Sequence, residues 1–472
     1  MMASTWIWRG SYDRLERVTY HENGPHVSGE RNGQPLHAQP WTEVKAGDAV
    51  IAWSDARTID CSRFKGVWVL NIKGHSTIKQ SEAEKLRIWR RAGLCGGPEV
   101  ESERLYRVGI VHLEPVEMVR IDASGKPMHG KPLLPAGSGG WPEDPVMRRV
   151  IRTAVSALYT LGLDIGEAVI SLGGDGRTAV RAAWPKLSDT RLEAAVLRRF
   201  AAWHAAARAE AVDRQLLIGA DPEFVLVTPA GKVASASRFF GAGVGGAAGA
   251  DAVRVGRRLL YPVAELRPEP ADNPAALAAN VRRLLLRAAE RISDPALRWA
   301  AGAMPVPGLA LGGHIHISGA PLTSRLLRLL DSYAAFPLAL IEDPAGRARR
   351  PRYGTLGDFR QQPHGGFEYR TLPSWLISPA AAKAGFALAL LCAREALNID
   401  YIPALDERYA EAYYAGDRSG LAGCLDGLAA SISATPSYDA LARFIEPLFE
   451  AARRGTTWDE SSDIRFKWRI PQ

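Results

Sequence analysis

Four segments of the chain each carry two ionisable side chains at positions i and i+2 in a largely apolar setting. In a β-strand, residues two apart point to the same face of the sheet. If the four segments are neighbouring strands, one sheet face therefore collects carboxylates, imidazoles and guanidinium groups. The pairs are Asp221 and Glu223 in GADPEFVL, Glu265 and Arg267 in AELRP, His314 and His316 in GGHIHI, and Glu368 and Arg370 in FEYRT.

Such a face would need a cation. Buried carboxylates that lie together raise one another's pKa, and leaving them uncompensated costs on the order of several kcal/mol. Carboxylates with one or two imidazoles and no thiolate favour Mg²⁺ or Mn²⁺ over zinc. The arginines favour a negatively charged substrate, because a guanidinium group binds phosphate or carboxylate through two hydrogen bonds. Metal ions beside arginines indicate phosphoryl transfer.

Taken singly, each pair has a plainer interpretation. The DPE triplet at 221–223 is also typical of an edge turn, because Pro222 cannot donate to a strand ladder. The ELR and EYR segments are also compatible with surface ion pairs, which stabilise little. Four such pairs on apolar strands of one domain favour the metal interpretation.

The sequence pattern changes near residue 214, and the elements that would position these groups come after that point. Before it, apolar runs at 48–53, 66–72, 105–113 and 115–127 predict strands, and 165–184 predicts a hairpin around GGDG. Helices are predicted over 81–94, 144–163 and 190–214. In the first, Ser81 and Glu84 have capping-box spacing, and the second begins with Asp144 before a proline.

After residue 214, strands are predicted at 217–228, 259–270, 312–317 and 366–372, with a helix from Pro274 to about Ile292 and mostly helix from 378. The glycine-rich stretch 241–250 lacks the Gly-Lys-Ser/Thr ending of a phosphate-binding P-loop and predicts a flexible loop. RARRPRYGTLGDFR, residues 347–360, concentrates arginines in another predicted loop. We expect an α+β protein with two domains, residues 1–214 and 215–472.

Six short segments of the second domain occur in a specific order and combination. They are GADPEF (219–224), GAD (249–251), ELRPEP (265–270), GGHIHI (312–317), RPRYGTLGDFR (350–360) and FEYRTLPSWL (367–376). Through them, residues 216 to about 376 resemble the phage-type carboxylate–amine ligases (amidoligases), a branch of the glutamine synthetase and glutamate–cysteine ligase superfamily. The resemblance implies a glutamine synthetase-like core, in which a curved antiparallel sheet wrapped by helices binds ATP and metals in its concave face.

The resemblance also implies roles for individual residues. His316 would face the acid substrate, and Arg360 and Arg370 would hold the γ-phosphate or the substrate carboxylate. Gly312 and Gly313 would let the backbone approach the ligand closely. Arg352 is a further candidate for binding the cofactor, and Arg267 either does the same or orients a carboxylate. The metal ions that bridge the ATP phosphates would be held by Asp221, Glu223, Asp251, Glu265, His314 and Glu368.

The implied reaction has two steps and uses ATP with Mg²⁺ or Mn²⁺. A substrate carboxylate attacks the γ-phosphate, and an amine then attacks the resulting acyl phosphate to form an amide or peptide bond. The expected partners are a small acid or a peptide carboxylate and an amine. A metal-dependent hydrolase or phosphotransferase, and a non-catalytic coat or interaction protein, are the alternatives.

The first domain also has a resemblance, carried by residues 68–94 and 161–187. They are similar to parts of an ATP-grasp domain of the kind found in spore-coat-associated proteins. The chain between Leu94 and Leu105 is too short for the lysine-bearing ATP-binding subdomain, and Arg181 and Ala183 stand where that family has Glu-x-Asn. We therefore expect a degenerate domain that presents substrate, binds a partner or serves as a scaffold.

Composition narrows the remaining classes of partner and location. The formal charge of +8 invites a nucleic-acid partner, but arginines spread along amphipathic helices such as 281–292, without interleaved aromatic residues, argue against one. No apolar run reaches the ~18 residues of a membrane span, and 380–393 predicts a buried helix. The N-terminus shows no signal-peptide pattern and the four cysteines are scattered. We expect a cytoplasmic protein, with spore association as an alternative and the oligomeric state left open.

Overall fold

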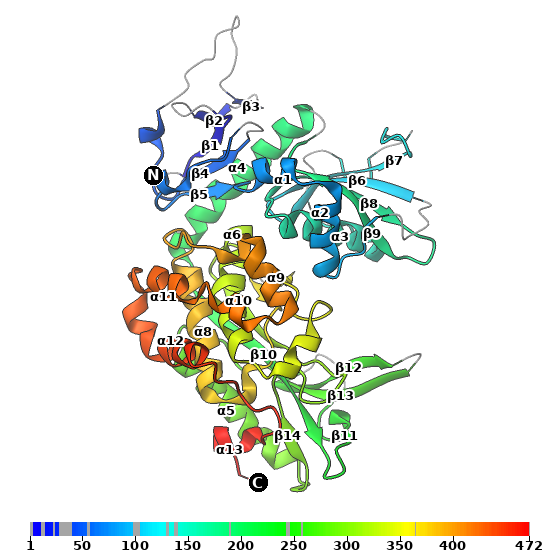
Figure 1. Ribbon diagram of the computed structural model, residues 1–472, viewed down its shortest axis with the longest axis vertical. Coiled ribbons are helices and arrows are strands. Elements are labelled where there is room, and N and C mark those ends of the chain that lie inside the picture. Colours follow the sequence, from blue (N-terminus) through cyan, green and yellow to red (C-terminus); the bar gives the residue numbers. More distant parts are fainter. Residues whose placement is uncertain are drawn as a thin grey trace, which may run out of the picture. The chain divides into compact units, whose positions relative to one another are not determined.

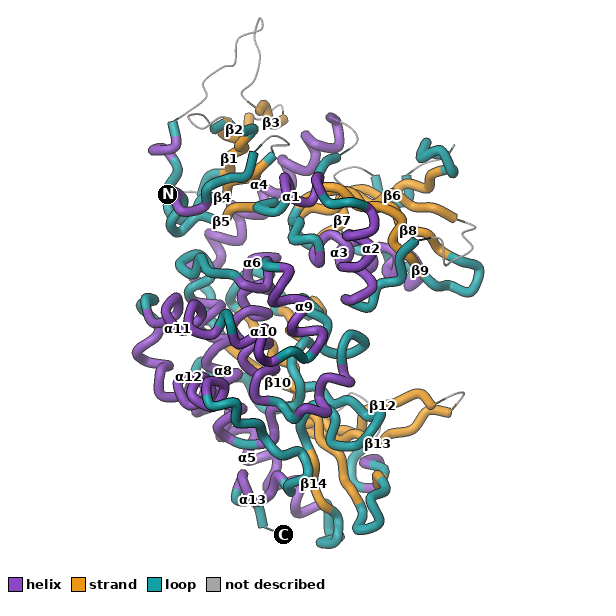
Figure 2. Tube along the Cα trace, viewed as in Figure 1, coloured by secondary structure: helices purple, strands orange, loops and turns teal. Residues whose placement is uncertain are grey.

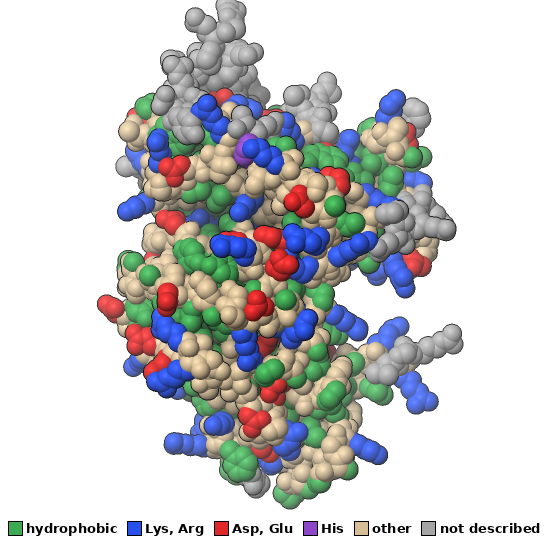
Figure 3. Space-filling model, viewed as in Figure 1, with side chains coloured by type: hydrophobic (Ala, Val, Ile, Leu, Met, Phe, Trp, Pro, Cys, Tyr) green, Lys and Arg blue, Asp and Glu red, His purple; other side chains and the backbone are tan. Residues whose placement is uncertain are grey.

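The computed structural model describes residues 3–10, 15–21, 24–27, 40–53, 57–97, 104–128, 132–135, 140–187, 190–241, 246–255, 258–363 and 365–471. The chain divides into two compact units, unit 1 (Met1–Asp213) and unit 2 (Arg214–Gln472) (Figure 1). Both units mix helices and strands, so the expectation of an α+β protein is confirmed. Lys and Arg side chains are interspersed with Asp and Glu on the face of each unit shown in Figure 3.

Unit 1 contains two sheets. In the first, with strand order β3-β2-β1-β4-β5, strands β1, β4 and β5 run parallel. The second, β7-β6-β8-β9, is antiparallel throughout. The strands are β1 Thr5–Trp8, β2 Glu16–His21, β3 Gly24–Val27, β4 Ala49–Ala52, β5 Trp68–Leu70, β6 Arg104–Val111, β7 Glu114–Ile121, β8 Ile165–Leu172 and β9 Thr178–Trp184. The helices are α1 Gly74–Lys79, α2 Glu82–Arg91, α3 Pro145–Thr160 and α4 Thr190–Asp213, with 3-10 turns at Trp41–Glu43 and Cys61–Arg63.

Local sequence signals account for the starts of two helices in unit 1. The Ser81 side chain accepts from the Glu84 backbone, and the Glu84 carboxylate accepts from the Ser81 N–H at 2.7 Å, which completes a capping box ahead of α2. Asp144 accepts the Val146 N–H at 2.7 Å, one residue before Pro145 opens α3. Both helices therefore begin where the capping pattern predicts.

Unit 2 is built on one curled, antiparallel, eight-stranded sheet (Figure 2). Its strand order is β12-β13-β10-β15-β17-β16, and β11 and β14 also pair with β10. The strands are β10 Leu217–Val227, β11 Val233–Ala234, β12 Ala248–Val255, β13 Arg258–Leu266, β14 Arg298–Ala300, β15 Gly313–Ser318, β16 Phe359–Gln361 and β17 Phe367–Tyr369. The predicted curved antiparallel sheet is confirmed.

Helices cover the apolar face of this sheet. Ile315 and Ile317 alternate with the two histidines of β15 and are fully buried, and α8 packs on β10 and β15 over that face. The predicted buried helix at 380–393 is thus confirmed as most of α8. The helices are α5 Pro274–Arg291, α6 Ser324–Leu330, α7 Phe336–Ile341, α8 Pro379–Arg394, α9 Glu407–Ala415, α10 Arg418–Ala422, α11 Leu425–Ser433, α12 Tyr438–Arg453 and α13 Ile464–Trp468. A π-helical turn spans Asp331–Ala335, and 3-10 turns span Ala236–Arg238, Pro344–Arg349, Trp375–Ile377 and Pro403–Leu405.

No helix within the described ranges combines the length and the apolarity that a bilayer crossing requires.

One predicted loop and one alternative interpretation are wrong. The predicted loop at 241–250 ends in strand β12 from Ala248 onward, while 242–245 lie outside the described residues. Its glycines and alanines carry no apolar periodicity, but Gly249 fits opposite Glu265 in the ladder. The DPE triplet is not an edge turn, because β10 pairs with β15 over Leu217–Pro222 and with β13 over Glu223–Val225.

Gly313→Ala should destabilise unit 2. The added Cβ would lie 2.5 Å from the Pro373 carbonyl oxygen and 2.7 Å from the buried Trp375 ring, and neither can move away freely. We expect a loss on the order of 2 kcal/mol, measured as a lower urea midpoint by tryptophan fluorescence.

The matched control is Gly385→Ala in α8, where the added Cβ meets atoms no closer than 3.9 Å. Because alanine is favoured over glycine inside a helix by ~0.5–1 kcal/mol, this variant should be as stable as the wild type or more so. Equal midpoints for Gly313→Ala and the wild type would contradict the packing account.

Candidate metal centre

The register of the unit 2 sheet brings the four polar pairs together. Asp221 stands opposite His314, and His316 stands opposite Glu368. On the other side of β10, Glu223 stands opposite Glu265. Since directly opposed residues of antiparallel strands share a face, all four pairs lie on the face away from α8.

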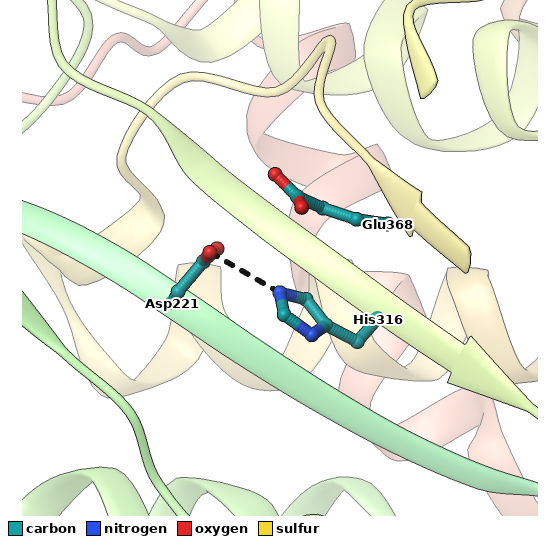
Figure 4. A group of neighbouring side chains, drawn as sticks. All are labelled: Asp221, His316 and Glu368. Atoms are coloured by element: carbon teal, nitrogen blue, oxygen red, sulfur yellow. Dashed lines mark ion pairs between the residues drawn. The ribbon is translucent and has the colours of Figure 1, made fainter. Parts of the chain in front are cut away.

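Three of these side chains form the histidine group, Asp221, His316 and Glu368, which come from β10, β15 and β17 and point toward one another (Figure 4). One ligand atom from each lies within 4.8 Å of the others, and His316 Nε2 lies 3.2 Å from Asp221 Oδ2. His314 lies at its side, with Nδ1 at 3.1 Å from both Asp221 Oδ1 and Glu368 Oε1. The resemblance implies that His316 faces the acid substrate. In the structure, His316 lies beside the two carboxylates, together with His314.

The carboxylate group consists of Glu223, Asp251 and Glu265, from β10, β12 and β13, whose oxygens also lie within 4.8 Å of one another. The Gly312 N–H donates to Glu223 Oε2 at 2.6 Å, and Arg267 Nη2 lies 2.6 Å from Glu265 Oε1. Asp251 is exposed and precedes an irregularity in the β12–β13 ladder. All six predicted metal ligands therefore lie in or beside the two groups.

Two arginines lie on the carboxylate of Glu368. Arg360 reaches Oε2 through Nη2 and through Nε at 2.7 Å, and Arg370 Nε lies 3.0 Å from Oε1. The Glu368 side chain is fully buried, whereas those of Arg360 and Arg370 are 55% and 37% exposed. Each guanidinium group is therefore anchored to a fixed carboxylate yet is open to solvent.

The arginine-rich segment divides between structural and exposed residues. Buried Arg349 donates to the carbonyls of Thr371 and Leu372 at 2.8 and 2.7 Å, and Arg350 pairs with buried Glu342 at 2.5 Å. Arg352 is exposed, with its guanidinium 5.3 Å from the centre of the Tyr353 ring. Among the described residues, Arg352 forms no ion pair with either acidic group.

Gly312, which precedes β15, and Gly313, its first residue, have packing roles at this site. A Cβ at Gly312 would lie 2.5 Å from His314 Nε2, and one at Gly313 would meet Pro373 and Trp375 as described above. Gly312 also supplies the N–H that orients Glu223. A side chain at Gly312 would displace His314 on the polar face, whereas one at Gly313 would displace Trp375 behind the sheet.

Burial and charge shift the titration of these residues. Burial raises the pKa of the Glu223 carboxyl to about 7; His314 and the Gly312 N–H oppose the shift, and Asp251 and Glu265 add to it. Burial also raises the pKa of Glu265, with a contribution from Asp221 and opposition from Arg267. For His314, burial lowers the pKa, but the contacts with Asp221 and Glu368 outweigh burial and raise it to about 10. The carboxylate group is therefore short of positive charge.

The donor set fits a divalent cation. Asp221 Oδ1, His314 Nδ1, His316 Nε2 and Glu368 Oε1 are buried and lie 3.0–3.2 Å from charged partners, yet none makes a well-directed hydrogen bond within the described structure. Buried polar atoms left in this state are costly. Oxygen-rich ligands with imidazole and no thiolate suit Mg²⁺ or Mn²⁺.

Sequence reasoning missed two residues at this site. Gln362 Nε2 donates to Glu368 Oε2 at 3.1 Å, and burial raises the pKa of Asp358, which Arg370 and His314 oppose. Both follow the spacing that identified the other pairs, since 358, 360 and 362 alternate along β16 and its approach. Asp358 lies within the predicted loop at 347–360, and Gln362 falls between that loop and the strand predicted from 366.

The family comparison covers nearly all of unit 2. Residues 218–470, more than half of the 472-residue chain, match the family described as phage phiEco32-like COOH.NH2 ligase-type 2. The chain belongs to this carboxylate–amine ligase family. No curated protein matches it in sequence.

Three of the solved structures that the chain resembles are distant likenesses. A bifunctional glutathione synthetase from Pasteurella multocida is 10% identical, with a TM-score of 0.34, over 54% of this chain and 52% of that one, so the chain spans about half its length. Apo GmaS is 16% identical, with a TM-score of 0.29, over 52% and 72%. The ATP-grasp ligase PsnB, complexed with precursor peptide PsnA2 and AMPPNP, is 13% identical, with a TM-score of 0.23, over 43% and 85%. With TM-scores below 0.5, these likenesses carry no argument for fold or activity.

Glu265→Gln should weaken Mn²⁺ binding, because it removes a charged ligand from the group that is short of positive charge. We expect about a tenfold or larger rise in the Kd, measured by the electron paramagnetic resonance signal of free Mn²⁺. Glu290→Gln, at an exposed position on α5, is the matched control and should bind as the wild type does. Equal affinities for all three proteins would rule out the carboxylate group as a metal site.

Arg360→Gln should have the opposite effect and tighten Mn²⁺ binding. Its guanidinium occupies Glu368, so a cation must compete with it for that carboxylate. We expect a gain of several-fold in the same assay, while Arg352→Gln, which removes an equal charge nearby without touching either group, should leave the Kd unchanged. A higher Kd for Mn²⁺ in Arg360→Gln would mean that the arginine supports the metal rather than competing with it.

Proposed function

We propose that the protein is an ATP-dependent ligase that joins a carboxylate to an amine through an acyl phosphate. The observation that carries this proposal is the gathering of two acidic groups and three arginines on one face of the unit 2 sheet. Membership of a carboxylate–amine ligase family supports it. We further propose that unit 2 has a glutamine synthetase-like core and that the metal is Mg²⁺ or Mn²⁺.

In this proposal, the histidine group with His314 and the carboxylate group hold the metal ions. When bound, these ions would neutralise the ATP phosphates and polarise the γ-phosphoryl group. Arg267 would keep Glu265 oriented through their 2.6 Å contact. The buried strands would keep the ligands in place, because most of them sit on paired strands rather than on loops.

Arg360 and Arg370 would hold the transferring phosphoryl group. A substrate carboxylate oxygen attacks the γ-phosphorus, the bond to the ADP oxygen breaks, and an acyl phosphate and ADP result. The amine then attacks the acyl carbon, so that an amide, inorganic phosphate and a proton leave. Two guanidinium groups that are partly exposed yet anchored on Glu368 are suited to stabilise the charge on the phosphoryl oxygens in both steps.

For unit 1 we propose a degenerate ATP-grasp-like role in presenting substrate or binding a partner. Arg181 and Ala183 lie on β9 at the positions of the missing metal ligands, and Arg181 Nη1 donates to the Gly97 carbonyl at 2.8 Å. A cation at this position would repel Mg²⁺. The substrates we propose are a small acid or a peptide carboxylate and an amine, in the cytoplasm.

Mass spectrometry offers a direct test of the ligase activity. A small-molecule extract incubated with the protein, ATP and Mg²⁺ should yield a product one water lighter than the sum of two of its components, and ADP release should depend on amines. ADP release that no amine affects would instead support a metal-dependent hydrolase or phosphotransferase. A melting temperature that Mg-ATP leaves unchanged would support a non-catalytic coat or interaction protein.

Glu368→Gln should lower ATP turnover by about 100-fold or more, since it removes a ligand of the histidine group and the anchor of both arginines. Circular dichroism and the melting temperature should show that the variant is folded. Arg181→Glu in unit 1 is the control and should stay within a few-fold of the wild-type rate. A large loss in Arg181→Glu would show that unit 1 takes part in the reaction, and unchanged turnover in Glu368→Gln would refute the site.

A further inference from the structure

A cavity of about 810 Å³ lies on the helical side of unit 2. Ala275 of α5, Ala380 and Lys383 of α8, Arg443 of α12 and Lys467 of α13 are among its lining residues. Helices α5 and α12 both pack against α8, as Figure 1 shows. Because α8 contacts the face of β15 that carries Ile315, this cavity is separated by the sheet from the metal centre.

The charged residues that line the cavity are all positive. Lys383, Arg443 and Lys467 contribute three cations, and none of its lining residues is acidic. Within the described part of the chain, neither lysine has a hydrogen bond or ion pair, whereas many surface arginines of unit 2 do, such as Arg453 with Asp426 at 3.2 Å. Two lysines without an ion-pair partner, beside the guanidinium of Arg443, favour a compact anion as ligand.

Two helix starts add to this positive potential. Helices α5 and α8 each begin with a proline, and the caps Asn273 and Ser378 accept the N–H of the third residue of each helix. The second residues, Ala275 and Ala380, line the cavity, and their N–H groups have no acceptor within the helix. A phosphate group would satisfy such donors and complement both helix dipoles.

The remaining wall of the cavity is apolar and includes an aromatic ring. Phe444 is half-buried, with the Arg443 guanidinium 4.6 Å from the centre of its ring, and Pro447 and Pro379 lie nearby in the lining. A planar group could pack on this wall beside the cations. The cavity is open to solvent, and its volume lies within the range of small-molecule sites.

We propose that this cavity is a second ligand site, which binds a phosphorylated small molecule with a planar body, the class that includes nucleoside diphosphates, without a metal ion. The cations and the two helix starts would hold the phosphates, and Phe444 with its apolar neighbours would hold the ring. A compact polyanion matches three cations around one hollow better than an extended acidic peptide does. The proposal is independent of the ligase reaction, because it uses other residues on the other side of the sheet.

Isothermal titration calorimetry of the full chain in EDTA tests this site, since chelation removes the metals that the other face would need. ADP should bind the wild type, and inorganic pyrophosphate should bind more weakly. Lys383→Ala and Lys467→Ala should each raise the ADP Kd by about tenfold, because each removes a charge-assisted contact. Lys232→Ala, an exposed lysine at a turn outside the cavity, should have no effect.

Phe444→Ala should remove the difference between ADP and pyrophosphate while pyrophosphate still binds. Glu223→Gln, at the metal centre, should leave ADP binding in EDTA unchanged, which separates this site from the proposed ATP site. No ADP binding in EDTA, or binding that both lysine variants leave intact, would overturn the proposal. Equal affinity of the wild type for ADP and pyrophosphate would overturn the assignment of the ring to Phe444.

Discussion

Carboxylates that share a sheet face repel one another, and the compensation of that repulsion shapes unit 2. Asp221, Glu223, Asp251, Glu265 and Glu368 lie on one face, and positive groups lie beside them: His314 between Asp221 and Glu368, Arg360 and Arg370 on Glu368, and Arg267 on Glu265. Compensation is uneven, because burial and neighbouring carboxylates still raise the pKa of Glu223 to about 7. An added divalent cation therefore gains most at the carboxylate group.

Strand β10 contains Pro222 in the middle of a sheet, at the point where the strand changes partners. A proline there normally removes a ladder hydrogen bond. The ladder to β15 ends at Pro222 and the ladder to β13 begins at Glu223, whose N–H donates to the Gly312 carbonyl at 3.0 Å. Pro222 thus stands where β10 exchanges partners, and that exchange places Asp221 in one acidic group and Glu223 in the other.

Much of the polar face could be predicted from the sequence, because the two-residue period of a strand fixes which side chains share a face. The order of the strands could not, since pairing between residues as distant as 221 and 314 depends on the whole fold. Strand β12 was missed because glycine and alanine carry no apolar pattern, and Gln362 because it falls between the predicted loop at 347–360 and the strand predicted from 366. Counting arginines could not separate buried Arg349 from exposed Arg352.

The positions of the side chains on the polar face depend on the layer that packs behind the sheet. Trp375 Nε1 donates to the Gly313 carbonyl at 2.8 Å, and Ser374 Oγ donates to the Glu223 carbonyl at 2.5 Å. Tyr369 follows Glu368 in the sequence. Its hydroxyl donates to buried Asp331 at 2.6 Å. The first two bonds hold the backbones of β15 and β10 from behind, and the third holds β17 through the Tyr369 side chain. Because the strands that carry the ligands are held from behind, the spacing of the two groups is set by the core rather than by the surface.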